Sequence, residues 1–124
     1  VVMTEGLDWD WETFPEYLDK VAAGKRDIDV AAYLPHSPLR VYAMGERGAA
    51  REVATDNDLA MMRQLTADAM RAGAIGFATS RFSIHKTADG NAIPTFDTDI
   101  AELEAITSGM KDAGAGTFQV VLDA

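Results

Sequence analysis

Three helices are predicted from stretches in which apolar residues recur every three or four positions after a capping residue. The first begins at Thr13, with Glu16 completing a capping box, and ends near Gly24. The second begins at Thr55 and ends near Gly73. The third is capped by Asp97 or Thr98 and ends at Gly114 or Gly116. The apolar stripes are Phe14, Tyr17, Leu18 and Val21; then Leu59, Met62, Leu65, Ala69 and Met70; then Ile100, Leu103, Ile106 and Met110.

Three short runs rich in β-formers predict buried strands at residues 30–34, 74–80 and 117–122. We expect Pro35 to end the first strand, because proline cannot donate to a sheet. Residues 39–44 are interpreted as a further extended segment, and residues 45–48, with a glycine at each end, as an exposed loop.

Helices and strands alternate along the chain, which favours an α/β fold of about three parallel strands joined by crossover helices. At 124 residues the chain is about half the length of a complete β/α barrel, which needs ~250. It lacks an initiator methionine and stops within a predicted strand, so we expect residues 1–124 to be one segment of a larger barrel domain, truncated at both ends. Cut strands leave sheet edges unpaired, and these edges favour self-association.

A formal net charge of −9 argues against nucleic acid and anionic membrane surfaces as partners, because both reward clusters of Lys and Arg. Cysteine is absent, so a metal would depend on His, Asp and Glu. No apolar stretch approaches the ~20 residues of a membrane span and no signal peptide is evident, so a cytoplasmic location is expected.

Polar residues at the ends of the predicted strands are the candidates for chemistry. His36 follows the first strand, where α/β sheets place their sites, and is interpreted as a metal ligand or a general acid or base; the alternative is a structural histidine bonded to a loop carbonyl. Arg40 either orients a substrate carboxylate or closes a salt bridge at the base of the loop. Ser80 and Arg81 end the second strand and are predicted to contact substrate.

The long polar loop at residues 81–95 is of the kind that carries function in compact domains. It contains Ser83, His85 and Lys86, and His85 is interpreted as solvated, with metal binding as the alternative. Asp123, after the third strand, is interpreted as a ligand, a base or a solvated acid. Walker, G-x-G-x-x-G, G-x-S-x-G and H-E-x-x-H motifs are absent, so nucleotide binding has no support.

Together these features resemble the interior of an N-acyl-D-amino-acid deacylase, the D-aminoacylase group of the amidohydrolase superfamily. Three phrases carry the resemblance: residues 11–18 (WETFPEYL), residues 35–45 (PHSPLRVYAMG) and residues 73–80 (GAIGFATS). The resemblance implies a metal-dependent β/α barrel, with zinc as the usual metal, that hydrolyses N-acyl-D-amino acids through a metal-activated water. On this pattern His36 matches the first of two metal-binding histidines, and the substrate is a small acylated amino acid.

One position departs from the family pattern, because the second histidine is expected near Phe118 and Gln119, where this sequence has none. Either metal is bound differently, with Gln119 nearby, or the chemistry has changed. A chain with one ligand is expected to be inactive alone, since a catalytic zinc site takes about three protein ligands. The alternative from another class is a non-catalytic α/β binding or assembly module in which His36 is structural.

Overall fold

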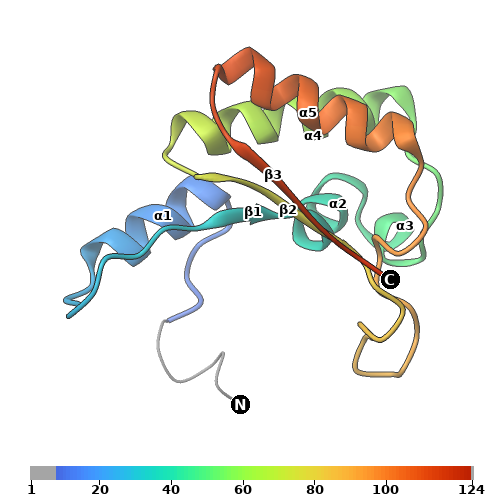
Figure 1. Cartoon of the computed structure of the whole chain (residues 1–124), viewed down its shortest axis with the longest axis horizontal. Helices are drawn as coiled ribbons and strands as arrows, with labels where there is room; N and C mark the ends of the chain where they lie inside the picture. The colour runs from blue at the N-terminus through green and yellow to red at the C-terminus, as the bar shows by residue number, and fades with distance from the viewer. Residues whose placement is uncertain (1–7, 124) are drawn as a thin grey trace.

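A computed structural model describes residues 8–123 as a three-stranded parallel sheet packed against helices (Figure 1). The elements, in chain order, are α1 (Phe14–Ala23), β1 (Tyr33–Pro35), α2 (His36–Met44), α3 (Glu46–Ala49), α4 (Asp56–Arg71), β2 (Gly76–Arg81), α5 (Ile100–Ala113) and β3 (Thr117–Leu122). The sheet order is β1-β2-β3, so β2 is central and both connections between neighbouring strands run through helices. The predicted α/β class with three parallel strands is therefore confirmed.

The crossover helices α4 and α5 lie side by side on one face of the sheet, and the core forms between them and β2 (Figure 1). Phe77 of β2, Met62 of α4 and Ile106 of α5 are fully buried there. Gly109 lets the two helices approach closely, because a Cβ at this position would lie 2.3 Å from the carbonyl oxygen of Arg63. The tight contact between α4 and α5 fixes both helices over the sheet.

Both threonines predicted to begin helices form capping boxes. The hydroxyl of Thr13 accepts a hydrogen bond from the backbone N–H of Glu16, and Thr55 does the same with Asp58. The N-cap of the third helix lies slightly later than expected: it is Asp99, in place of Asp97 or Thr98, and it makes no side-chain capping bond. The predicted C-terminal end of this helix is confirmed, with Gly114 in the left-handed conformation at φ 70°.

The segment around the first strand differs most from its prediction. β1 is only Tyr33–Pro35, with Pro35 as its last residue, and Val30 is exposed, so residues 30–34 are not a strand buried on both faces. Residues 39–44 belong to helix α2 and not to an extended segment. The buried residues of α2 show why: His36, Leu39, Arg40 and Met44 have helical spacing, which is hidden in the sequence because two of them are polar.

Three further predictions were wrong. Residues 45–48 are not an exposed loop, because helix α3 begins at Glu46 and Gly48 is buried against the carbonyl of Arg40. The third strand forms as predicted at Thr117–Leu122 but is exposed along its whole length, since it lies at an edge of the sheet in the described residues. Ile100, placed on the buried face of its helix, is also exposed.

We expect Gly109→Ala to destabilise the protein by about 1 to 3 kcal/mol, because the added methyl group collides with the backbone of α4. This reverses the usual gain of about 1 kcal/mol for Gly→Ala inside a helix. The matched control is Gly24→Ala, whose Cβ meets nothing closer than 3.7 Å. Urea unfolding of both variants checks the prediction, and equal stability of the two would contradict the close packing.

Candidate functional site

The carboxyl ends of the three parallel strands lie at the same end of the sheet, and most of the predicted site residues lie there. They form two groups. The buried network consists of His36, Arg40, Thr79 and Glu102, and the polar rim consists of Ser80, Ser83, His85 and Asp123. The two groups differ in burial, so they are suited to different roles.

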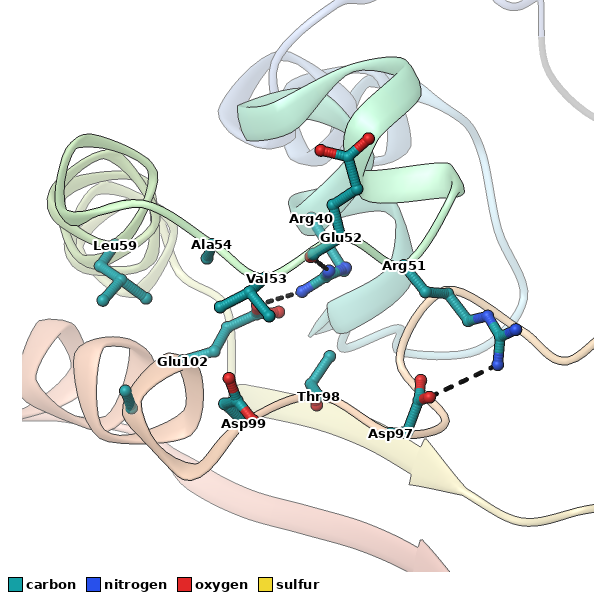
Figure 2. A pocket seen from close by; sticks show the side chains of 11 residues that line it. Arg40, Arg51, Glu52, Val53, Ala54, Leu59, Asp97, Thr98, Asp99 and Glu102 are labelled. Atoms are coloured by element: carbon teal, nitrogen blue, oxygen red, sulfur yellow. Dashed lines mark hydrogen bonds and ion pairs between the residues drawn. The ribbon is translucent and has the colours of Figure 1, made fainter.

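Glu102 is the centre of the buried network and is 1% exposed. It lies in the first turn of α5, where the helix dipole favours a negative charge. One carboxylate oxygen accepts from His36 Nε2 at 2.7 Å, and the other pairs with the guanidinium of Arg40 (Figure 2). The network therefore joins α5 to α2, which follows β1 directly.

His36 links the same carboxylate to the central strand. An ionised carboxylate only accepts hydrogen bonds, so His36 Nε2 donates to Glu102. His36 Nδ1 lies 2.7 Å from Thr79 Oγ1, and in a neutral imidazole it accepts from the Thr79 hydroxyl. Whether the imidazole is neutral or protonated, both of its nitrogens are hydrogen-bonded, one to Glu102 and the other to Thr79.

Arg40 is 2% exposed and its donors are engaged as well. Besides Glu102, the guanidinium donates to the carbonyls of Gly48, at 3.2 Å, and of Glu52. The adjacent cavity, about 50 Å³ in volume, holds only about one or two waters and is bordered by an Arg51–Asp97 ion pair (Figure 2). In this structure Arg40 closes a buried salt bridge, one of its two predicted roles, and offers no surface to a substrate.

The pKa of Glu102 is held below its ordinary value by these neighbours. Burial by itself raises the pKa, but the hydrogen bonds from His36 and Arg40, together with the charge of the guanidinium, outweigh burial. Arg40 and Glu102 balance each other's charge. No buried side-chain nitrogen or oxygen atom among the described residues lacks a hydrogen-bond partner.

The polar rim lies at the solvent side of the same strand ends. Ser80, the fifth residue of β2, has its Oγ 2.7 Å from Nδ1 of the exposed His85. Ser83 donates to the Asp123 carboxylate from its backbone N–H at 3.0 Å and from its hydroxyl at 3.0 Å, which ties the loop to the end of β3. His85 and Asp123 are thus part of an ordered set of contacts.

Arg81 serves as an anchor for the long loop between β2 and α5. Its Nη2 donates to the carbonyl of Thr98 at 3.0 Å and its Nε to that of Phe96 at 3.4 Å. Thr95 reinforces this fold-back by donating to the carbonyl of Ser80 at 2.9 Å. The predicted contact of Arg81 with substrate remains a prediction, and two of its nitrogens, Nε and Nη2, already donate to these carbonyls.

The metal expected at His36 finds no fitting site in the described residues. A ligating histidine must present a nitrogen lone pair, whereas one His36 nitrogen donates and the other is bonded to Thr79. Across residues 8–123 no group of three or more His, Asp or Glu side chains is arranged to hold a metal ion. Gln119, considered as a substitute ligand, lies on the exposed strand β3 beside Ala78.

A larger groove of about 450 Å³ lies between α1, β1, α2 and α4, and Pro35 at the carboxyl end of β1 forms part of its wall. Its walls are mainly apolar and aromatic and include Trp11, Tyr17, Tyr33 and Tyr42. Trp9 and Trp11 stack at its border with ring centroids 5.2 Å apart. We place the candidate site at the polar rim, because its serine, histidine and aspartate side chains are hydrogen-bonded to one another at the carboxyl ends of β2 and β3.

Comparisons with known proteins point to one group of enzymes. A D-aminoacylase of Alcaligenes xylosoxydans xylosoxydans is 36% identical over 81 residues, which is 65% of this chain and 16% of that protein. An N-acyl-D-aspartate deacylase of the same organism is 37% identical over 70 residues, or 56% of this chain and 14% of that protein. These matches support a relation to the D-aminoacylase group over part of the chain.

The chain spans less than a fifth of the length of either relative. No protein-family model and no solved structure matches it. None of the helices in the described part of the chain has the length and apolar character needed to cross a membrane.

Glu102 is the site residue that sequence reasoning missed. Its position carried a signal, because residues 102, 106, 109 and 110 have the spacing of one helix face and all four are buried. An acidic residue on a buried stripe requires a partner, and the arginine and histidine after β1 supply it.

We expect Glu102→Gln to destabilise the protein by about 3 to 5 kcal/mol, because it leaves the buried charge of Arg40 without a counter-charge. Glu104→Gln, on the exposed face of the same helix, is the control and should change stability by less than about 0.5 kcal/mol. Because the pKa of Glu102 is lowered on folding, its stabilisation is complete above the ordinary glutamate pKa of 4.5 and is lost as pH falls through the lower folded pKa.

Urea unfolding between pH 7 and pH 3 measures both effects. The difference in stability between wild type and Glu102→Gln should shrink as the pH falls below about 4.5. A difference that stays constant over this range would show that the carboxylate charge is not what stabilises the network.

Proposed function

We propose that the full-length protein is an amidohydrolase that cleaves the amide bond of N-acyl-D-amino acids or related acylated substrates. The observation that carries this proposal is the similarity to two deacylases over 81 and 70 residues. The parallel sheet is compatible with part of a β/α barrel, in which active sites lie at the carboxyl ends of the strands. We propose that residues 1–124 are one segment of such a catalytic domain.

Within this segment the polar rim is the part proposed to meet the substrate. Ser80 is only half-buried and His85 is exposed, so their polar atoms are accessible at the strand ends. His36 and Arg40 are enclosed, so we propose that they support the site and do not touch the substrate. The chain therefore contributes substrate contacts and their scaffold to the proposed reaction.

The zinc ion implied by the family resemblance belongs to the proposal for the full-length protein. Because both nitrogens of His36 are engaged and no ligand group forms in residues 8–123, we propose that this ion is held by residues other than His36.

A second candidate function, a non-catalytic α/β module that self-associates, has one observation in its favour. β3 exposes Phe118, Val120, Val121 and Leu122 at a sheet edge that is unpaired in the described residues. Exposed apolar edge strands favour pairing with another chain.

The hydrolase proposal predicts that the purified full-length protein releases carboxylate from N-acetyl-D-amino acids and does so much more slowly from the L enantiomers. Product amine measured by a ninhydrin-type assay, with both enantiomers in parallel, is the direct test. Absence of hydrolysis across a panel of N-acyl-D-amino acids, together with concentration-dependent self-association, would contradict the enzyme and favour the assembly module.

The metal content of the same preparation tests the role of His36. We expect bound zinc in the wild type and an equal amount per folded molecule in His36→Gln, despite a loss of stability of about 1 to 3 kcal/mol from the broken buried hydrogen bonds. Metal analysis of the folded, monodisperse fraction of each protein measures this zinc content. Loss of metal in a variant that remains folded would make His36 a ligand after all.

A further inference from the structure

The pair formed by Ser80 and His85 is placed where a parallel α/β sheet binds its ligands. Ser80 lies near the carboxyl end of β2, the central strand, and His85 follows in the loop that begins there. Their side chains meet at 2.7 Å, between Ser80 Oγ and His85 Nδ1. His85 is exposed, and its other ring nitrogen, Nε2, is not used in this contact.

The surrounding loop holds this pair in a fixed geometry. The ring of Phe82 meets the imidazole edge to face, with centroids 5.3 Å apart and an interplanar angle of 89°. The backbone N–H of Phe82 also donates to Ser80 Oγ at 3.3 Å. Two residues before His85, Ser83 is bound to Asp123 at the end of β3. A hydrogen-bonding pair that is ordered in advance binds a ligand at a lower entropic cost.

The pair has hydrogen-bond donors to offer an anion. When the imidazole is protonated, its Nδ1–H donates to Ser80 Oγ, so the Ser80 hydroxyl hydrogen and the His85 Nε2–H can both donate to a ligand. A carboxylate has two acceptor oxygens for such donors. The acid of the polar rim, Asp123, accepts hydrogen bonds from the N–H and hydroxyl of Ser83.

The arginines at the strand ends already have protein partners. Arg40 is buried against Glu102, and Arg81 donates to the carbonyls of Phe96 and Thr98. Lys86 is exposed next to His85 and adds positive charge to the same loop. Both His85 and Lys86 are exposed at these strand ends.

From this geometry we propose that Ser80 and His85 bind the carboxylate of the acylated amino acid. This inference rests on the proposed hydrolase function, because it assigns one end of that substrate to a particular pair of side chains. The substrate class that it selects is an N-acylated amino acid with a free carboxylate, in preference to its amide or ester.

The experiment compares N-acetyl-D-alanine with N-acetyl-D-alaninamide, in which a neutral carboxamide replaces the carboxylate, using the full-length protein. The wild type is expected to prefer the carboxylate by about 10- to 100-fold in kcat/KM and in Kd measured by calorimetry. His85→Gln and Ser80→Ala should each remove most of this preference by raising KM for the carboxylate, while kcat and the binding of the carboxamide stay near wild type.

Lys86→Gln is the matched control, since it removes a full charge from the neighbouring residue but leaves the Ser80–His85 contact in place, and it should retain the preference. Equal weakening of both ligands in His85→Gln, an unchanged preference, or no preference in the wild type would each overturn the inference. Calorimetry separates the two proposals. If the protein discriminates between the two ligands without hydrolysing them, the carboxylate site is supported and the hydrolase proposal is contradicted. If the protein hydrolyses N-acetyl-D-alanine and His85→Gln has no effect, the hydrolase proposal is supported and the carboxylate site is contradicted.

Discussion

The buried ion pair between Arg40 and Glu102 is the interaction on which the rest of this structure depends. Both side chains are excluded from solvent, so each charge is tolerable only because the other lies against it. His36 extends the pair to Thr79 on the central strand. One carboxylate in the first turn of α5 thus holds together the start of α2, the middle of the sheet and the start of α5.

This arrangement fixes both ends of the loop that carries Ser83 and His85 of the polar rim. The loop leaves β2 just after Ser80 and Arg81 and returns to α5 at Asp99, three residues before Glu102. Hydrogen bonds from Arg81 and Thr95 fold the loop back on the strand ends. The Ser80–His85 pair therefore lies on a support that is buried and fully hydrogen-bonded, as a binding site requires when it is ordered before the ligand arrives.

Much of the fold could be predicted from local patterns, because the elements that form as expected have strong local signals. Thr13 and Thr55 cap their helices through side chains a few positions away, and Gly76 allows the close approach of Thr117 that a strand glycine suggests. The segment after β1 was misinterpreted because the inward face of α2 includes His36 and Arg40, whose burial depends on Glu102, 62 residues beyond Arg40 in sequence. Tertiary pairing of this kind is invisible to local periodicity.

The most direct test of this account is amide hydrogen exchange across residues 82–99 in the full-length protein, comparing wild type with Glu102→Gln and Glu104→Gln. If the buried pair holds the loop, exchange in these residues should accelerate in Glu102→Gln and stay unchanged in Glu104→Gln, under conditions where both remain folded. Unchanged protection of the loop in Glu102→Gln would contradict the claim that the buried network supports the candidate site.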